Sequence, residues 1–69
     1  MTKRERDKLR GREREVWSST YARTFERELK KRLEPGVRFD REVETSARSA
    51  LGKADLAVEG MRRAESENA

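Results

Sequence analysis

The second half of the chain carries an apolar seam with the spacing of a helix that packs against other helices. Its members recur at alternating steps of four and three residues and are Val43, Ala47, Ala50, Ala54, Ala57, Met61 and Ala64. Such a pattern, kept over about three heptads, predicts a long amphipathic helix covered along the seam by a second helix. Small side chains at its centre let two helix backbones approach closely, and Leu51 and Val58 widen it.

A bulkier apolar stripe precedes the seam. Trp17, Tyr21, Phe25, Leu29 and Leu33 recur at every fourth residue. At about 100° per residue this stripe shifts by roughly 40° at each step and covers a broad face. A bulky stripe that faces an alanine-rich seam is a sensible match within one chain, so we expect the two segments to pack together.

A short break separates the two patterns. Pro35 disfavours helical geometry at Glu34, Gly36 permits a turn, and Asp40 is a good N-cap for the second helix. Two helices joined by a short loop form an antiparallel hairpin. The sequence therefore predicts one all-α domain over residues 1–69. Its expected parts are a basic arm or frayed helix over 1–12, a helix over 13–34, a loop over 35–40 and a helix over 41–65.

The chain has few large side chains with which to close a core alone. Its 69 residues include no cysteine, so disulfides cannot compensate for the small core. We expect two hairpins to form a homodimeric four-helix bundle. The residues expected to pack within the hairpin or the dimer are Trp17, Phe25, Leu29, Ala47, Ala50, Ala54, Ala57, Val58 and Met61.

The absence of His and Cys removes the usual catalytic bases, thiol nucleophiles and zinc ligands. Hydroxyl groups cluster at Ser18, Ser19 and Thr20, but no known spacing of a nucleophile and its base is met. We predict a non-enzymatic protein that needs no metal or cofactor. No stretch approaches the roughly 20 apolar residues of a membrane span, and no signal peptide is recognised, so a cytoplasmic location is expected.

Basic residues are concentrated in the first half. Residues 1–33 carry 12 Lys or Arg and 6 Asp or Glu, whereas residues 34–69 carry 6 and 8. This asymmetry favours an electrostatic docking face for an acidic partner or nucleic acid. The arm over 1–12 is the main nucleic-acid signal, but its interleaved acids would repel phosphates. Nucleic-acid binding is therefore the less favoured alternative to a charged face that is solvated or docks a protein.

The candidates for partner contacts are Val37, Arg38, Phe39, Glu42, Glu44 and Tyr21. Val37, Arg38 and Phe39 form an expected loop between two rigid helices, where an aromatic and an Arg can bind a partner. The alternative, that Phe39 caps the bundle end and Arg38 is solvated, is equally open. Tyr21 is a candidate because Tyr dominates many interfaces, although plain core packing is its alternative.

Two motifs carry a resemblance. Trp17-x-x-x-Tyr21-Ala22-x-x-Phe25, a Pro/Gly break, and Ala54-Asp55-x-Ala57-Val58-x-x-Met61-Arg62 resemble small helical-hairpin accessory proteins of temperate bacteriophages. Within that group, length and charge are similar to those of quorum-sensing anti-activators of Pseudomonas phages. The resemblance spans residues 16–63 and leaves the arm outside.

The resemblance implies a dimeric, non-catalytic protein of the host bacterial cytoplasm. It would bind a LuxR-type quorum-sensing regulator and block its DNA binding, and would also bind the type IV pilus assembly ATPase to limit superinfection. Because a DNA-binding surface is basic, the expected contacts on this chain are acidic: Asp40, Glu42, Glu44, Asp55 and Glu59. Two alternatives stay open, a nucleic-acid-binding phage protein that uses the arm and a structural adaptor that pairs helices with another phage protein.

Overall fold

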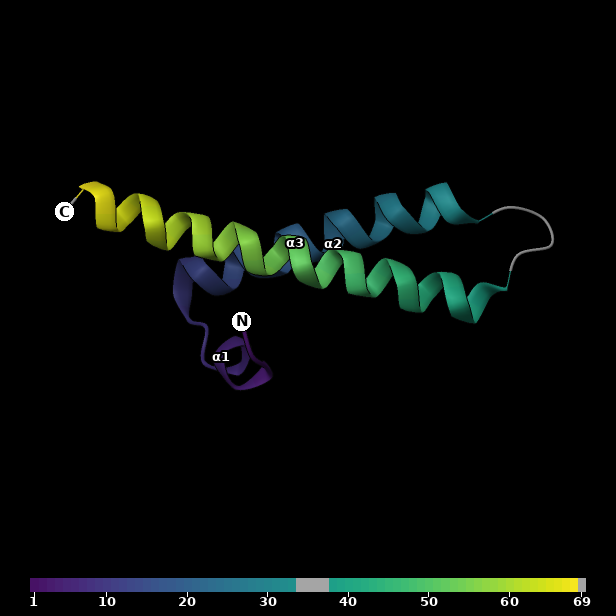
Figure 1. Cartoon of the computed structure of the whole chain (residues 1–69), viewed down its shortest axis with the longest axis horizontal. Coiled ribbons are helices and arrows are strands. Elements are labelled where there is room, and N and C mark those ends of the chain that lie inside the picture. The colour runs from purple at the N-terminus through teal and green to yellow at the C-terminus, as the bar shows by residue number, and fades with distance from the viewer. Residues whose placement is uncertain (34–37, 69) are drawn as a thin grey trace.

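Three helices make up the described part of the chain (Figure 1). The computed structural model describes residues 1–33 and 38–68. Within these ranges α1 spans Lys3–Asp7, α2 spans Gly11–Arg32 and α3 spans Phe39–Asn68, and there is no strand. The all-α class predicted from the sequence is confirmed, and the two long helices pack together. No described helix is long and apolar enough to cross a membrane.

The basic arm is an ordered element. Thr2 caps α1: its hydroxyl accepts the Glu5 amide at 3.2 Å, and the Glu5 carboxylate accepts the Thr2 amide at 3.4 Å. This reciprocal pair satisfies two amides that a helix start leaves open. The helix lasts five residues, and the side chain of Leu9, which follows it, is only 2% exposed. The frayed or flexible arm expected over 1–12 is therefore replaced by a short capped helix and a buried leucine.

The chain changes direction between α1 and α2 at a glycine. Gly11, the first residue of α2, has φ +56°, a conformation that costs a residue with a Cβ far more than it costs glycine. Arg10 before it is extended and makes no side-chain cap. The turn places α1 beside the long helices (Figure 1).

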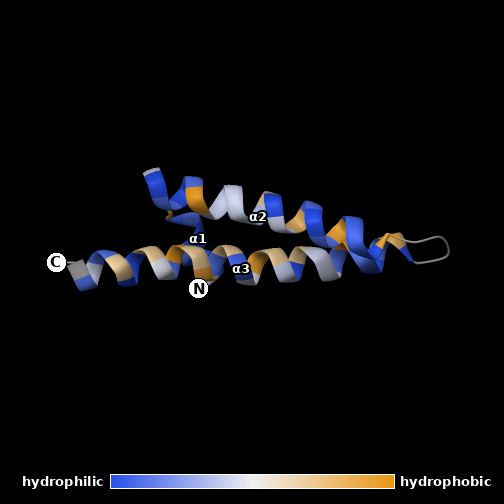
Figure 2. Cartoon of the chain, turned by 90° about the horizontal axis from the view of Figure 1, so that it is seen from above, coloured by the Kyte–Doolittle hydropathy of each residue, from blue (hydrophilic) through white to orange (hydrophobic). Residues whose placement is uncertain are grey.

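The contact between α2 and α3 is built from small residues. The two helices lie side by side in both views, and their chain directions are opposite (Figures 1 and 2). On α3 the fully buried members of the predicted seam are Ala50 and Ala54, with Val58 beside them. On α2 the buried residue is Thr24, at 3% exposure. Short side chains on both sides allow the backbones to approach closely, so little volume is enclosed between them.

The aromatic stripe of α2 lies on the flank of this contact rather than at its centre. Trp17 stacks on Tyr21 with ring centroids 5.2 Å apart, and Tyr21 stacks on Phe25 at 6.1 Å. All three rings are partly exposed, as is Leu29, and Leu33 at the end of the stripe is exposed. The 40° shift per step explains this drift, because the stripe leaves the helix contact as it proceeds.

The remaining boundary expectations concern the two long helices. The second begins at Phe39 and ends at Asn68, earlier and later than the expected 41–65. The Arg38 carbonyl accepts the Glu42 amide at 3.1 Å, so the helix is already established before Asp40, which is not its N-cap. The first long helix spans Gly11–Arg32, so it begins and ends two residues earlier than the expected 13–34, and Leu33 after it is extended. The expected loop residues 35–37 lie outside the described residues.

The molecule is elongated. Its principal extents are 51 × 22 × 16 Å and its radius of gyration is 14.2 Å, whereas a compact domain of this length would have about 11 Å. A single layer of paired helices explains the difference. Each long helix consequently keeps much of its circumference open to solvent.

Candidate functional site

Asp55, near the middle of α3, joins three parts of the chain. The Arg6 guanidinium donates from Nε to Oδ1 at 2.9 Å and from Nη2 to Oδ2 at 2.6 Å. The Trp17 indole Nε1–H donates to Oδ1 at 2.9 Å. The N-terminal amine lies 4.0 Å from Oδ2 and 3.6 Å from Glu59. Asp55 itself is buried, so one carboxylate connects α1, α2 and α3.

These donors hold Asp55 in its ionised form. The hydrogen bond from Arg6 is the main reason that the pKa of Asp55 lies below its ordinary value; the Trp17 hydrogen bond adds to this, while burial opposes it. The bidentate geometry is the strong form of an Arg–carboxylate pair. Because both of its oxygens accept hydrogen bonds from within the chain, Asp55 acts as a clamp for the N-terminal segment. The expectation that Asp55 offers its charge to a basic partner is therefore wrong.

A second ion pair links the start of α2 to the end of α3. Arg62 donates from Nε to Glu13 Oε2 at 2.5 Å and from Nη2 to Oε1 at 3.5 Å. The hydrogen bond from Arg62 lowers the pKa of Glu13 and, reciprocally, that of Arg62 is raised. Both side chains are substantially exposed, so this pair contributes little to the stability of the fold.

An open groove of about 580 Å³ runs between α2 and α3. Its lining combines short side chains, three cations and one leucine, which are Thr20, Arg23, Thr24, Arg27, Lys53, Leu56 and Ala57. Leu56 is 66% exposed and is thus the most exposed large apolar side chain of the described residues. A furrow between two helices with an apolar side chain at its edge is the shape that accepts a third helix.

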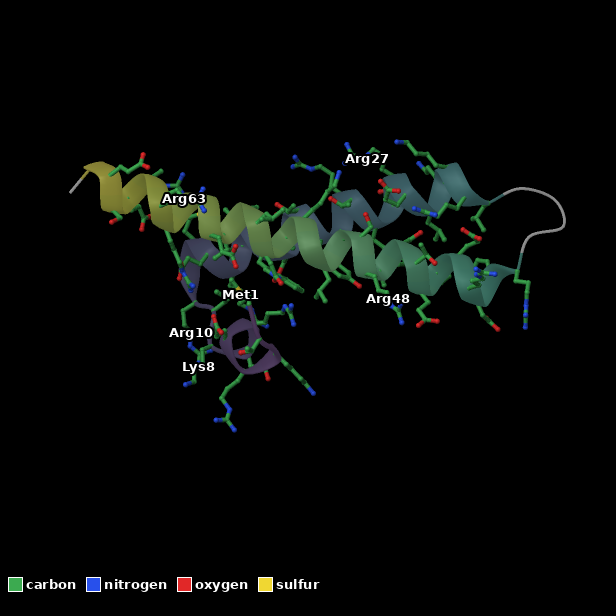
Figure 3. All side chains as sticks on the ribbon, viewed as in Figure 1. Met1, Lys8, Arg10, Arg27, Arg48 and Arg63 are labelled. Carbon is green, nitrogen blue, oxygen red and sulfur yellow. The ribbon has the colours of Figure 1, made fainter. Side chains whose placement is uncertain are left out.

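The groove and the aromatic stripe lie on neighbouring sides of α2, because the mean directions of their residues differ by about 110° around the helix. Phe25 and Arg27 are two residues apart and therefore about 160° apart around the helix. Arg27 projects from the outer edge of α2, while Arg48 projects from the opposite edge of the molecule on α3 (Figure 3). The protein therefore has two distinct faces, one aromatic and one basic.

The cations of the groove make no ion pair, as is true of most Lys and Arg side chains in the described part of the chain. Arg48 pairs with Glu44 at 2.7 Å and Lys30 with Glu26 at 3.0 Å. In contrast, Arg23, Arg27 and Lys53 make no ion pair with any residue in 1–33 or 38–68. The groove therefore carries positive charge that the described part of the fold does not neutralise.

The partner-binding residues predicted from the sequence are not brought together. Arg38, Phe39 and Glu44 are exposed at the start of α3, and Glu42 is partly exposed. Tyr21 stacks on Trp17, and the Trp17 indole donates a hydrogen bond to Asp55. Asp55 lies 16 residues, or about 24 Å, along α3 from Phe39. Tyr21 therefore belongs to a different surface, and Val37 lies outside the described residues.

The first turns of α3 also correct two finer expectations. Phe39 is 60% exposed, so among the described residues it does not cap the end of the helix pair. Glu44 is already paired with Arg48, which reduces the charge that it can offer to a basic partner. Arg38 is exposed, in agreement with the solvated alternative.

The packing set predicted from the sequence divides by depth. Ala50, Ala54 and Val58 are buried. The others are partly exposed and lie at the margins of the helix contact: Trp17, Phe25, Leu29, Ala47, Ala57 and Met61.

The sequence interpretation missed the Asp55 clamp and the groove. Leu9, alone among charged neighbours, was the available signal that the arm docks on the helices. Asp55 directly follows Ala54 of the seam. An acidic residue at such a position was the signal that Asp55 pairs with another residue of the same chain. The groove had no comparable signal, because it depends on how far apart α2 and α3 pack.

Comparison with known proteins gives no relative. No family model, no curated protein and no solved structure matches this chain. The interpretation of the two motifs as those of phage anti-activators stays a prediction, and the site is therefore interpreted from its own geometry.

Proposed function

We propose that this protein is a non-enzymatic binding module that acts by docking on another protein through the groove between α2 and α3. The observation that supports this proposal is the exposure of Leu56 at the groove edge. Burial of a leucine side chain contributes about 1.5–3 kcal/mol, most of which the isolated chain forgoes at this position. A partner that covers Leu56 would gain this burial free energy.

The targets that we propose come from the resemblance of residues 16–63. They are a LuxR-type quorum-sensing regulator, whose DNA binding the protein would block, and the type IV pilus assembly ATPase. An elongated molecule with a longest extent of 51 Å is large enough to cover a DNA-binding surface. Arg38 and Phe39, exposed at the start of α3, would provide a further contact.

We also propose that the chain forms an antiparallel hairpin that dimerises into a four-helix bundle through its aromatic face. The partly exposed rings of Trp17, Tyr21 and Phe25, together with Leu29, support this arrangement, because a second copy would cover them. Sedimentation equilibrium measures the association directly. A monomer at about 100 µM would contradict the dimer and leave the groove proposal standing.

The binding proposal is tested by capture from nuclease-treated bacterial lysate at about 150 mM salt, with mass spectrometry of the bound proteins. Three baits are compared: the natural chain, Leu56→Lys and the control Arg48→Glu on the opposite edge. We expect stoichiometric capture that Leu56→Lys abolishes and Arg48→Glu retains. Purified candidate targets are then tested for inhibition of operator binding or of ATPase activity. Capture that is identical with all three baits would contradict the proposal.

One observation favours a second function, nucleic-acid binding. Arg12, which lines a hollow on α2 next to Arg23, extends the basic face formed by Arg23, Arg27 and Lys53. Four phosphate contacts predict a log–log salt slope of about −3.6, or ~150-fold weaker binding between 50 and 200 mM salt. Docking on an apolar protein surface would change far less, so a salt titration separates the two functions.

A further inference from the structure

The floor of the groove is made of short side chains. Thr20 and Thr24 line it from α2 and Ala57 lines it from α3, with Leu56 at the rim. Apart from the cations and Leu56, the described residues that line it have short side chains. Such a floor permits close approach of a third backbone, since helix axes with small contact residues pack at the short end of the 8–10 Å range.

Two glycines flank Leu56 on the exposed side of α3, next to the groove. Gly52 and Gly60 lie four residues before and after Leu56, so the three residues share one side of the helix within about 80°. A Cβ added to either glycine meets no atom within 4 Å. Glycine inside a helix is less stable than alanine, and nothing in the described fold requires it here. Close approach of another molecule to this side would explain why glycine, and not a larger residue, stands at both positions.

The rim of the groove is positively charged. Arg23 and Arg27 are four residues apart on α2, a spacing at which like charges repel. Lys53 faces them from α3 across the groove. None of the three pairs with an acid in the part of the chain that the structure describes. Carboxylates brought by an occupant would relieve this repulsion on both sides.

We propose that the groove between α2 and α3 binds an acidic amphipathic helix of another protein, with apolar side chains on Leu56 and Ala57 and carboxylates on Arg23, Arg27 and Lys53. This inference rests on the proposed binding function and specifies the chemistry of its partner. The apolar side chains of Leu56 and Ala57 distinguish this occupant from nucleic acid, because phosphates gain nothing from contact with them. A second copy of the chain is disfavoured, because symmetric pairing of two such grooves would oppose cation to cation.

The probe is a fluorescein-labelled, helical 18-residue peptide with leucine on one face and glutamate on both flanks. A matched peptide carries lysine in place of glutamate, and a 20-base-pair DNA duplex is the third probe. Each is titrated with the full chain at about 150 mM salt and followed by fluorescence anisotropy. We expect saturable binding of the acidic peptide and at least a tenfold preference over the lysine peptide and the duplex.

Two variants locate the binding. Arg27→Glu reverses one rim charge, and Gly60→Leu adds a side chain where the isolated fold has open space. Each substitution is expected to weaken binding of the acidic peptide by at least tenfold. Arg48→Glu is the matched charge control, and circular dichroism verifies that each variant is helical. Equal weakening by Arg48→Glu, or no effect of either groove variant, would overturn the inference.

The failures of the two proposals are distinguishable. No peptide binding, together with lysate capture that depends on Leu56, overturns the acidic-helix inference and keeps the binding function. Preferred binding of the duplex overturns the inference and favours the nucleic-acid function. Self-association that Arg27→Glu abolishes identifies a second copy as the occupant, which also overturns it.

Discussion

Two apolar residues of α3, two positions apart, offer a sharp test of the fold. Val58 is fully buried against α2, whereas Leu56 is 66% exposed in the groove. We predict that Val58→Ala strongly destabilises the protein and that Leu56→Ala, which deletes more carbon, barely does. Hydrophobicity alone would rank the two in the reverse order.

The magnitude follows from burial. Val58→Ala removes two buried methyl groups, worth about 0.8 kcal/mol each on transfer from water. The cavity left in a contact made of small residues raises the cost to about 2–3 kcal/mol. Leu56→Ala is expected to change the unfolding free energy by at most about 0.5 kcal/mol, as an exposed substitution does. Against a total of about 3–10 kcal/mol for a chain of this length, the first change is severe.

Thermal and urea unfolding followed by circular dichroism measure both values. For a domain of this size 1 kcal/mol shifts Tm by about 4–8 °C, so Val58→Ala should lower Tm by roughly 8–24 °C. The comparison should be made at several protein concentrations, because a dimer would make Tm concentration-dependent. Equal effects of the two substitutions would refute the assigned packing of α3 on α2.

Three further predictions concern single groups. Ser46 is fully buried and its hydroxyl has no partner among the described residues, so Ser46→Ala should raise the unfolding free energy by about 1 kcal/mol; a loss of stability in urea unfolding would show that the hydroxyl is bonded. Gly60→Ala should raise it by about 0.5–1 kcal/mol through helix propensity, and a lower Tm would mean that the open space at this position is filled. Because the folded pKa of Asp55 is lowered by Arg6 and Trp17, its stabilisation is present above the unfolded value near pH 4 and is lost as pH falls through the folded pKa. The indole N–H resonance of Trp17 should therefore shift only on acidification below the ordinary Asp value near pH 4, and a shift centred at or above pH 4 would contradict the Asp55 clamp.

The seam of α3 was predictable from the sequence because burial there follows helical periodicity. Ala50 and Ala54 recur on one face, and one face of a long helix is all that α2 can cover. The stripe of α2 was only half predictable. Its residues are apolar, but a stripe with a period of four drifts around the helix. Phe25 therefore lies in the stack with Tyr21, and Thr24 takes the central position in the contact with α3.

The N-terminal segment could not be predicted from local pattern. The five residues of α1 are all charged, and charge alternation of this kind is typical of a solvated segment. Its position depends on Arg6 meeting Asp55, 49 residues away, and no local spacing encodes such a contact. The groove could not be predicted from the sequence either, because its cations lie on two helices whose relative rotation only the packed structure defines.

The Asp55 clamp also has a kinetic consequence. Both of its bonds span long stretches of chain, 49 residues from Arg6 and 38 from Trp17, and the acceptor is in place only after α2 and α3 have paired. We therefore predict that α1 closes onto the helices late in folding and that the same segment opens first in the native state. In hydrogen exchange the amides of residues 3–10 should lose protection together, well before those around Ala54. The chain thus behaves as a stable helix pair with a separately opening N-terminal unit.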